Sequence, residues 1–315
     1  MAEVLFSPQL AEEVRGKVVV MTGGAQGIGA ATVSLLFNLG AHVFFGDWDE
    51  SRGRELVETL QDARTDVKGS IRFTKLDVRD YSAQLQLFDD AYQKYGRVDV
   101  AISCAAVTEP NGWFGPEHLD LETVKVEPEP IYNTININLT SVVSFCRIAL
   151  AYMKKDKTTD PSKAPQAPFS KSIVLVSSIA GLLESPGLFA YGSAKHGVVG
   201  LMRSLRQWAP AKYGVRVNTI CPWATDTQLM DQVRAKWVEE GLPINTTEKV
   251  GKLIVQCACD KDLNGRAVLV GGGRGFDMEE GLDRTLPQWM GAELYKDFHR
   301  GQEAIGLGDD WSSKE

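Results

Sequence analysis

The sequence predicts an α/β fold: a single domain built on a doubly wound parallel sheet of about seven strands, with helices on both faces. Short apolar runs typical of buried strands alternate with longer segments of helical periodicity along most of the chain. A glycine-rich turn follows the first of these runs, and polar residues follow several of the others. The length of 315 residues exceeds one average domain, but α/β folds of this size often form one unit.

The first predicted unit comprises a strand, a glycine turn, a helix and a second strand: Lys17 to Met21, Thr22 to Gly29, Ala30 to Leu39 and Ala41 to Gly46. This order is typical of the Rossmann βαβ unit. The glycines let the backbone approach a pyrophosphate, and the start of the helix offers free N–H groups to it. The turn therefore predicts a dinucleotide site, and the residues predicted to bind the dinucleotide are Gly23, Gln26, Gly27, Ile28 and Gly29. The alternative is a purely structural turn.

Asp47 ends the second strand, 18 positions after Gly29. A carboxylate there can accept hydrogen bonds from the adenosine ribose and would repel a 2′-phosphate, so it favours NAD over NADP. Asp49, two residues further on, is the nearest competitor for this role, and Trp48 is expected to cover the adenosine from solvent.

The alternation continues with helices from Ser51 to Ala63 and from Ser82 to Tyr95, and with strands from Ile71 to Leu76 and from Asp99 to Cys104. Ligands of open parallel sheets bind at the carboxyl ends of the strands. The residues that follow these strands, Asp77, Val78 and Ala105, are therefore predicted to contact the cofactor. The alternative for Asp77 is the N-cap of the next helix.

Residues 107–130 interrupt the rhythm with several prolines and acidic residues and with the apolar pair Trp113 and Phe114. Such a long loop in a compact domain is usually either functional or disordered. A long helix, Ile131 to Met153, is predicted after it and contains Asn138, and a buried strand follows from Ile173 to Val176.

The run from Ser178 to Lys195 contains the strongest candidates for chemistry. Tyr191 and Lys195 are four residues apart at the start of a helical pattern that extends to Tyr213, which places both on one face. Tyrosine is a poor base at its ordinary pKa of about 10, but a nearby ammonium favours the phenolate. The Ser178 hydroxyl could bind the same substrate oxygen. The alternative is a surface tyrosine and a solvated lysine at helical spacing.

The last predicted strands run from Val215 to Cys221 and from Ala267 to Val270, with a helix from Glu248 to Cys259 between them. Residues 224–247 follow a strand end and have an apolar face, which fits a substrate lid or an ordinary amphipathic helix. The core thus spans about residues 17–275. A C-terminal extension, residues 276–315, is too rich in aromatic residues to be wholly disordered.

Composition excludes several classes of function. The net charge of −7 and the pI near 5.3 argue against nucleic acid or an anionic membrane as a partner. The five cysteines have no spacing typical of a disulfide framework, and no metal site is predicted. No apolar stretch is expected to span a membrane, and the N-terminus lacks the order of a signal peptide, so a cytoplasmic protein is expected.

These residues together resemble the short-chain dehydrogenase/reductase family over about residues 17–275. The resemblance rests on this ordered set: Thr22 to Gly29, Asp47, Asp77, Asn138, Ser178, Tyr191, Lys195, Pro222 and Thr227. Within the family, the sequence is most similar to the NAD-dependent 15-hydroxyprostaglandin dehydrogenases. The similar stretches are Gly46 to Trp48, Ile137 to Leu139, Ala194 to Gly197, Asn218 to Pro222 and Leu263 to Gly265.

The resemblance implies a role for each matching residue. Tyr191 would be the acid/base at the substrate oxygen, and Lys195 would lower its pKa and hold the nicotinamide ribose. Ser178 would bind the substrate oxygen, and Asn138 would position a water that leads away from Lys195. Cofactor contacts are further implied for Pro222, Thr225 and Thr227.

Three departures from the family pattern bear on the substrate. Ser103 to Ala106 replaces the family's Asn-Asn-Ala-Gly, Trp223 replaces the glycine after Pro222, and Leu188 replaces a polar residue. We therefore expect Ser178, Leu188 and Trp223 to contact a substrate other than a prostaglandin. Candidate pocket residues are mostly apolar, which fits a small hydrophobic ligand.

The sequence thus predicts an NAD-dependent enzyme that interconverts a bulky hydrophobic secondary alcohol and its ketone. The alternative is a family member in specialised metabolism that catalyses a reductive, isomerising or cyclising step on a hydrophobic metabolite. A non-catalytic dinucleotide-binding protein is a third reading, against which the intact set of Ser178, Tyr191 and Lys195 argues. The two long predicted helices resemble those of family dimers, so a homodimer or homotetramer is expected.

Overall fold

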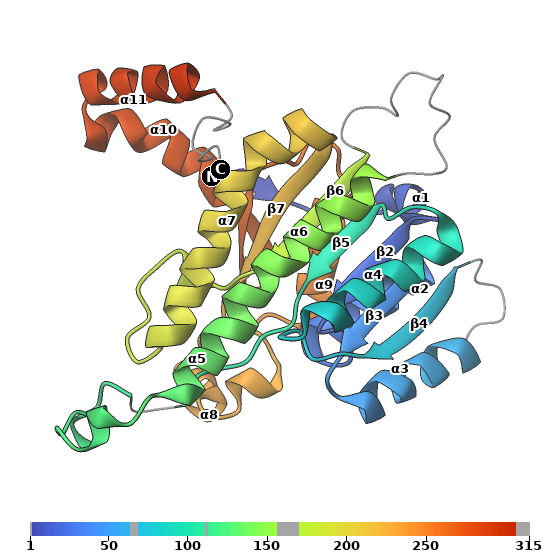
Figure 1. The fold of residues 1–315 in the computed structure, drawn as a ribbon, viewed down its shortest axis with the longest axis horizontal. Coiled ribbons are helices and arrows are strands. Elements are labelled where there is room, and N and C mark those ends of the chain that lie inside the picture. The colour runs from blue at the N-terminus through green and yellow to red at the C-terminus, as the bar shows by residue number, and fades with distance from the viewer. Residues whose placement is uncertain (1, 64–68, 111–112, 156–169, 307–315) are drawn as a thin grey trace.

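A nine-stranded sheet forms the centre of the computed structural model, which describes residues 2–63, 69–110, 113–155 and 170–306 (Figure 1). The strands are β1 (Glu3–Val4), β2 (Val18–Thr22), β3 (His42–Asp47), β4 (Ser70–Lys75), β5 (Val100–Ser103), β6 (Lys171–Val176), β7 (Val215–Pro222), β8 (Ala267–Gly271) and β9 (Arg274–Asp277). The helices are α1 (Leu10–Val14), α2 (Gly27–Asn38), α3 (Glu50–Asp62), α4 (Tyr81–Tyr95), α5 (Glu129–Ile135), α6 (Ser141–Lys154), α7 (Phe189–Tyr213), α8 (Arg234–Glu239), α9 (Thr247–Cys259), α10 (Met278–Met290) and α11 (Ala292–Ile305).

The strand order is β1-β9-β8-β7-β6-β5-β2-β3-β4. Strands β2 to β8 are parallel, which confirms the predicted doubly wound sheet of about seven strands. The chain reverses its direction of winding between β2 and β5, and ligands of such sheets bind outside the strand ends at this point.

At one edge, the sheet has two further strands with antiparallel pairing that the sequence analysis missed. Strand β9 pairs with β8, and β1, in a segment expected to be only a short lead-in, pairs with β9 through Glu3↔Phe276 and Val4↔Gly275. A two-residue strand is too short for any hydrophobic periodicity, and its partner lies about 270 residues away in the chain. Only the folded structure can define such an element.

Helices cover both faces of the sheet, and each face has its own core (Figure 1). Helices α4, α6 and α7 pack on one face, where the rings of Phe88 and Phe145 lie 5.0 Å apart. Helices α1, α2, α3 and α9 pack on the other, around Phe45 and Phe37. Parallel strands buried on both faces explain the nearly continuous apolar runs in the sequence.

The predicted helix from Ile131 to Met153 is interrupted in the structure. It is divided into α5 and α6 by a π-helical turn, Asn136–Thr140, and such turns are frequent at functional sites.

Among the described residues, the stretch Glu129–Lys154 is long and apolar enough to cross a membrane by length and composition, contrary to our expectation. Half of its most apolar window is buried in the protein, as in the core helix of a globular fold.

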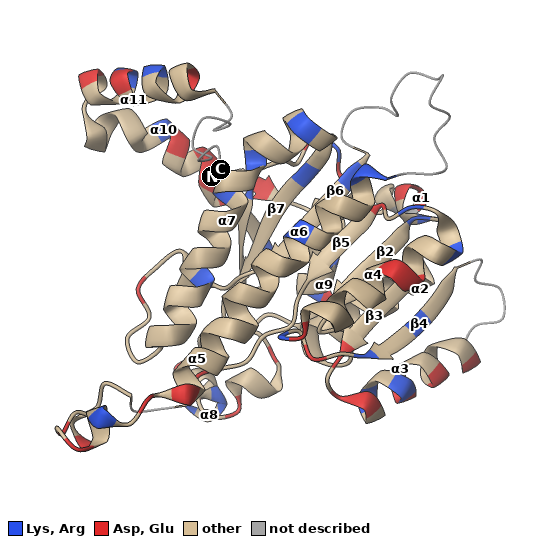
Figure 2. Ribbon diagram, viewed as in Figure 1, with Lys and Arg blue, Asp and Glu red and all other residues tan. Residues whose placement is uncertain are grey.

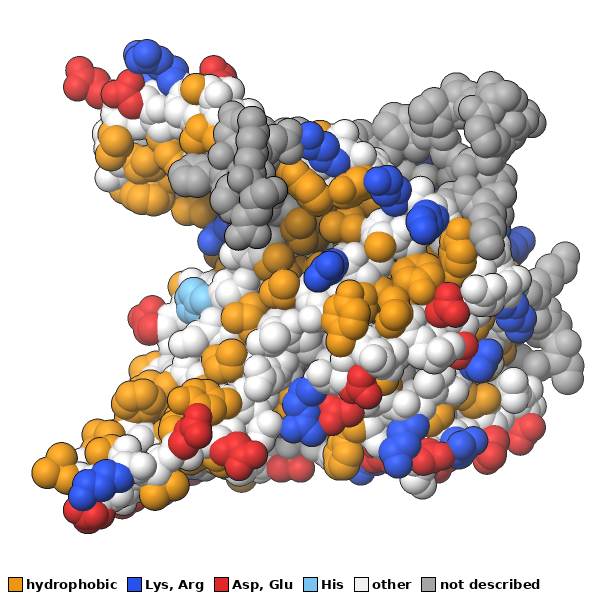
Figure 3. Space-filling model, viewed as in Figure 1, with side chains coloured by type: hydrophobic (Ala, Val, Ile, Leu, Met, Phe, Trp, Pro, Cys, Tyr) orange, Lys and Arg blue, Asp and Glu red, His pale blue; other side chains and the backbone are white. Residues whose placement is uncertain are grey.

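Two segments project from this framework. The 107–130 insertion forms an arm at the lower left of Figure 1, with single-turn 3₁₀ helices at Pro116–His118 and Thr123–Lys125; residues 111–112 lie outside the described part. Its apolar side chains are largely exposed (Figure 3). The C-terminal extension forms the hairpin of α10 and α11, which confirms that this segment is structured up to residue 306; residues 307–315 lie outside the described part.

Charged residues are concentrated on the outside of the molecule, and acidic and basic side chains alternate on helices such as α3 (Figure 2). Glu279 at the start of α10 is an exception, because it is completely buried. Its carboxylate accepts hydrogen bonds from Arg203 and Arg206 of α7, with shortest N···O distances of 2.7 and 2.9 Å. This ion pair fixes the C-terminal hairpin to the rest of the fold.

Candidate active site

The glycine turn after β2 has the close contacts that a dinucleotide-binding turn requires. Gly23 has a φ of +72°, and a Cβ there would lie 2.4 Å from the backbone nitrogen of Ala105. A Cβ at Gly29 would lie 1.8 Å from the carbonyl oxygen of Gly23, so the first turn of α2 packs directly on the loop. Gln26 precedes α2 and its side chain does not cap the helix. The N–H groups of Gly27 and its neighbours thus remain available for an anion, and this geometry fits a pyrophosphate.

The structure separates the roles of the two acidic candidates after β3. Asp47 is buried, and its carboxylate accepts hydrogen bonds from the backbone N–H groups of Ala25 (2.9 Å) and Asp49 (3.1 Å). Asp49 instead caps α3 by accepting from the N–H of Arg52. Asp47 therefore remains the residue suited to a ribose. Trp48 is 71% exposed, so its indole lies in solvent in this structure.

The other predicted cofactor residues also lie at the carboxyl edge of the sheet. Asp77 does not cap α4, because Asp80 does; Asp77 pairs with Arg79 at 2.6 Å, which lowers the pKa of the Asp77 carboxyl. The side chain of Val78 is buried in the core. Ala105 lies against Gly23, so the loops after β5 and β2 touch each other.

Tyr191, Ser178 and Lys195 converge at the start of α7. Tyr191 is the third residue of this helix, and the Ser178 side chain hydrogen-bonds its phenol. Lys195 follows one turn later, with its Nζ 5.4 Å from the centre of the Tyr191 ring. The Lys195 side chain is almost completely buried, and its Nζ donates a hydrogen bond to the carbonyl of Val176 at 3.1 Å. The structure thus brings the predicted trio together.

Burial dominates the electrostatics of this trio. It raises the pKa of the Tyr191 phenol above its ordinary value, and the hydrogen bond from Ser178 opposes the rise. Burial also lowers the pKa of Lys195 to about 8. The expectation that Lys195 shifts the Tyr191 pKa downward is therefore not met in this structure, because the cost of desolvating the phenolate outweighs the hydrogen bond from Ser178 that lowers this pKa. At neutral pH the phenol is protonated and can donate a proton.

Asn138 is fully buried in the π-helical turn. Its Oδ1 accepts from the N–H of Val107 at 2.9 Å, and its Nδ2 donates to the carbonyl of Val107 at 2.8 Å. The amide thus fixes the loop after β5. Its predicted role in holding a water stays a prediction.

Two residues near the site were missed by the sequence analysis. Glu109 is buried, and its carboxylate accepts from the backbone N–H groups of Phe189 and Tyr191. Arg52 donates hydrogen bonds to the side chains of Gln26 and Gln228, and so connects the glycine turn with the segment after β7. The absence of a capping side chain at Leu188 was a possible signal for an acidic partner, but nothing in the sequence identified Glu109 as that partner.

The segment after β7 lies beside these groups. Pro222 ends the strand, and Thr225 and Asn245 form a β-bridge that closes the 224–247 segment into a loop. The methyl group of Thr227 would lie 3.1 Å from a Cβ at Gly27, so this threonine lies against the glycine turn. Its implied contact with the cofactor stays a prediction. That the segment moves as a lid stays a prediction.

Aromatic and apolar residues lie near the same edge. Trp223 packs edge-on against Trp237 of α8, with ring centres 5.4 Å apart. The ring centres of Phe114, in the arm, and Phe189, in α7, lie 4.5 Å apart. Phe189 directly follows Leu188 in the sequence. Both substrate candidates outside the catalytic trio, Leu188 and Trp223, are partly buried.

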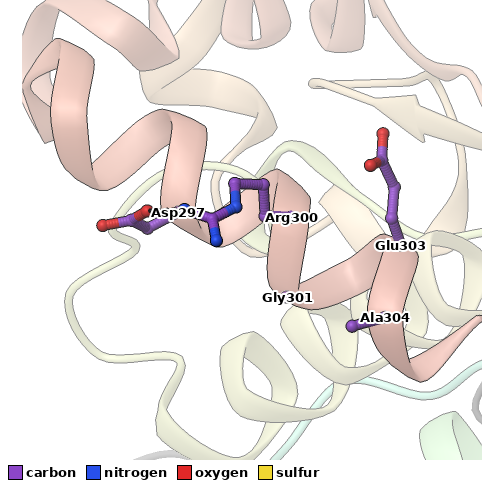
Figure 4. A pocket seen from close by; sticks show the side chains of 5 residues that line it. All are labelled: Asp297, Arg300, Gly301, Glu303 and Ala304. Atoms are coloured by element: carbon purple, nitrogen blue, oxygen red, sulfur yellow. Dashed lines mark hydrogen bonds and ion pairs between the residues drawn. The ribbon is translucent and has the colours of Figure 1, made fainter.

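Two kinds of feature away from this edge could also mark a site: clusters of acidic, histidine and cysteine side chains, and a depression on the C-terminal hairpin. Within residues 2–63, 69–110, 113–155 and 170–306, no group of three or more His, Cys, Asp or Glu side chains could hold a metal ion. An open depression on α11 is lined by Asp297, Arg300, Gly301, Glu303 and Ala304 (Figure 4). Asp297 and Arg300 pair with each other there at 3.2 Å, and none of these residues belongs to the strand ends.

Comparison with known proteins agrees with this geometry. The sequence pattern of the short chain dehydrogenase family matches residues 17–237. The chain is 34% identical to the short-chain dehydrogenase/reductase ascJ of Acremonium egyptiacum, over 85% of this chain and 83% of the relative. It is 31% identical to the 5′-hydroxyaverantin dehydrogenase of Dothistroma septosporum, over 92% and 95% of the two chains.

The similarity to 15-hydroxyprostaglandin dehydrogenase is more limited than the sequence motifs indicated. The chain is 30% identical to the NAD(+) enzyme of that name from Mus musculus, over 70% of this chain and 71% of the relative. The crystal structure of gox2181 superposes with a TM-score of 0.68 at 25% identity, over 84% of this chain and 98% of that one. The glycine turn, the catalytic trio and these matches together place the chain in the short-chain dehydrogenase/reductase family, as an NAD(P)-dependent oxidoreductase.

Proposed function

We propose that the protein interconverts a bulky hydrophobic secondary alcohol and its ketone with NAD as the cofactor. The observation that carries the proposal is the convergence of Ser178 and Lys195 on the Tyr191 phenol, at the same sheet edge as the glycine turn. A hydroxyl donor, a buried ammonium and a phenol around one point suit proton transfer at an alcohol or carbonyl oxygen.

The residues divide the reaction between them. A bound nicotinamide supplies the hydride chemistry, and the chain supplies position and proton transfer. The Ser178 hydroxyl binds the substrate oxygen beside Tyr191. In oxidation, the Tyr191 phenolate accepts the alcohol proton; in reduction, the phenol donates it to the developing alkoxide. Below about pH 8, where Lys195 keeps its proton, its buried ammonium favours negative charge on the phenol oxygen.

NAD is proposed rather than NADP because of Asp47. This carboxylate is buried and held by two backbone N–H groups, so it cannot rotate away from a 2′-phosphate without losing them. A fixed negative charge there repels a phosphate and accepts hydrogen bonds from a ribose diol. The name of the mouse relative also specifies NAD(+).

The proposed substrate class follows from the aromatic residues near the trio. The pairs Trp223–Trp237 and Phe114–Phe189 place apolar surface on the lid segment and on the start of α7. Such lining favours a ligand with a large apolar body and few polar anchors. The relative named 5′-hydroxyaverantin dehydrogenase is, by its name, a dehydrogenase of a hydroxylated compound.

The test combines purified protein with NAD and a panel of hydrophobic secondary alcohols, and follows NADH absorbance. Replacing Tyr191 by Phe should reduce turnover about a thousandfold, because it removes the proton-transfer group. Tyr213→Phe, at the far end of the same helix, is the matched control and should keep the activity. Equal rates for the wild type and Tyr191→Phe with every active alcohol would contradict the proposal.

A second candidate function is a reductive, isomerising or cyclising step on a specialised hydrophobic metabolite. It is favoured by Trp223, whose indole stands where the family pattern has a glycine and is fixed by Trp237. A product with the oxidation state of the substrate, formed without net turnover of the cofactor, would select this candidate.

The protein is further proposed to act as a homodimer or homotetramer. In support, the long helices α6 and α7 lie side by side on one face of the sheet, and α6 presents the apolar Val143 to solvent. Light scattering of the purified protein gives its mass; a monomer at all concentrations would contradict this proposal.

A further inference from the structure

Helix α7 is capped by a residue from another part of the chain. The carboxylate oxygens of Glu109 accept from the N–H of Phe189 at 2.8 Å and from the N–H of Tyr191 at 2.5 Å. The residue before the helix, Leu188, has no side-chain group that could do this. First-turn N–H groups lack partners within their own helix, so the contact satisfies two donors. Glu109 thus holds the backbone of Tyr191 itself.

The loop that carries Glu109 is held on both sides of it. The Asn138 amide makes two hydrogen bonds with the backbone of Val107, two residues before Glu109. Phe114, further along the same loop, contacts the ring of Phe189. With only 5% of its surface exposed, Glu109 is fixed between these anchors. A displacement of the loop would therefore displace the start of α7.

Glu109 also places a negative charge at a functionally sensitive position. The start of a helix is the positive end of its dipole and favours an anion such as the Tyr191 phenolate. A carboxylate at the same end opposes that effect. The other groups around the phenol are Lys195 on α7, Ser178 after β6 and Cys221 in β7. Ser178 is uncharged, and burial raises the pKa of Cys221 to about 12. The charged neighbours of Tyr191 among these groups are therefore Lys195, beside the ring, and the Glu109 carboxylate, on the backbone N–H.

We propose that Glu109 is a positioning residue for Tyr191: it fixes the first turn of α7, and its charge favours the protonated form of the phenol. The proposal rests on the proposed function in giving Tyr191 the proton-transfer role. It assigns the 107–130 insertion a part in the reaction through Glu109, near the start of the insertion.

A titration of the phenol tests the effect of charge without substrate or cofactor. The ultraviolet absorbance of the phenolate is followed against pH in the wild type and in Glu109→Gln, each corrected with its Tyr191→Phe counterpart. We expect the pKa of Tyr191 to fall by about half a unit or more in Glu109→Gln, because a nearby like charge is removed. Glu117→Gln, an exposed carboxylate of the same insertion, should leave the titration unchanged. An unchanged titration in Glu109→Gln would overturn the charge effect.

A second variant tests the positioning. Glu109→Asp keeps the charge but is too short to reach both N–H groups, so kcat should fall about tenfold or more with little change in KM. The pKa of Tyr191 should still be higher in Glu109→Asp than in Glu109→Gln. If Glu109→Gln does not fold, as judged by circular dichroism, Glu109→Asp alone decides, and wild-type kcat in that variant would overturn the proposal. Because the titration needs no turnover, it stays informative even if no alcohol is oxidised.

Discussion

The Nζ of Lys195 lies 5.4 Å from the centre of the Tyr191 ring and donates its hydrogen bond to the carbonyl of Val176. Lys195 is therefore held beside the phenol by the end of β6, the same strand that is followed by Ser178. An ammonium buried this deeply has lost most of its hydration, which lowers its pKa to about 8.

Removing the Lys195 charge should change the pH dependence of stability. The folded pKa lies below the ordinary value of 10.5, so the unfolded chain binds more protons between about pH 8 and 10.5. The free energy of unfolding should therefore rise with pH across this window, by about 3 kcal/mol in total. Lys195→Met should lack this rise, and its melting temperature below pH 8 should equal or exceed that of the wild type. Parallel melting curves for the two proteins from pH 7 to 10 would contradict the prediction.

Removing the Ser178 hydroxyl should affect both the rate and its pH dependence. Its hydrogen bond lowers the Tyr191 pKa, so Ser178→Ala should raise that pKa. Alcohol oxidation needs the phenolate, so the rising limb of the pH–rate profile should move to higher pH. Turnover should also fall about a hundredfold, because one donor that binds the substrate oxygen is lost. The control is Ser193→Ala on the exposed side of α7. A pH–rate profile with the wild-type midpoint would refute the expected shift.

Replacing Asp47 by Asn should weaken discrimination between the cofactors. The amide keeps the size of the carboxylate but removes the charge and one of its acceptor contacts. We expect the KM for NAD to rise about tenfold or more and activity with NADP to appear or increase. Asp49→Asn, which alters only the cap of α3, should keep the wild-type preference. Initial rates with both cofactors decide, and a larger loss of preference in Asp49→Asn would show that the roles are reversed.

Breaking the buried ion pair of Glu279 should destabilise the fold. Glu279→Gln removes the charge that pairs with Arg203 and Arg206, and the loss should be about 3 kcal/mol of unfolding free energy. Glu280→Gln, at the exposed neighbouring position, should cost much less. Urea unfolding measures both variants. Equal midpoints would mean that the C-terminal hairpin contributes little to the stability of the domain.

The sequence by itself determined the strand and helix alternation, the glycine turn, the Asp47 position and the spacing of Ser178, Tyr191 and Lys195. These features are local: hydrophobic periodicity, backbone freedom at glycine and one helical turn are all encoded within a few neighbouring residues. Parallel strands buried on both faces made the pattern especially clear, because most of these strands contain a nearly continuous apolar run.

Only the tertiary structure decided what depends on distant partners. The pairing of β1 with β9 joins segments some 270 residues apart in the chain, and Glu109 caps a helix that begins 80 residues later. The direction of the Tyr191 pKa shift is of the same kind: the Tyr-to-Lys spacing indicated an attraction, but the cost of desolvation depends on everything packed around the phenol. Spacing along a chain fixes which groups can meet, whereas burial, which the whole fold creates, fixes which charge state they hold.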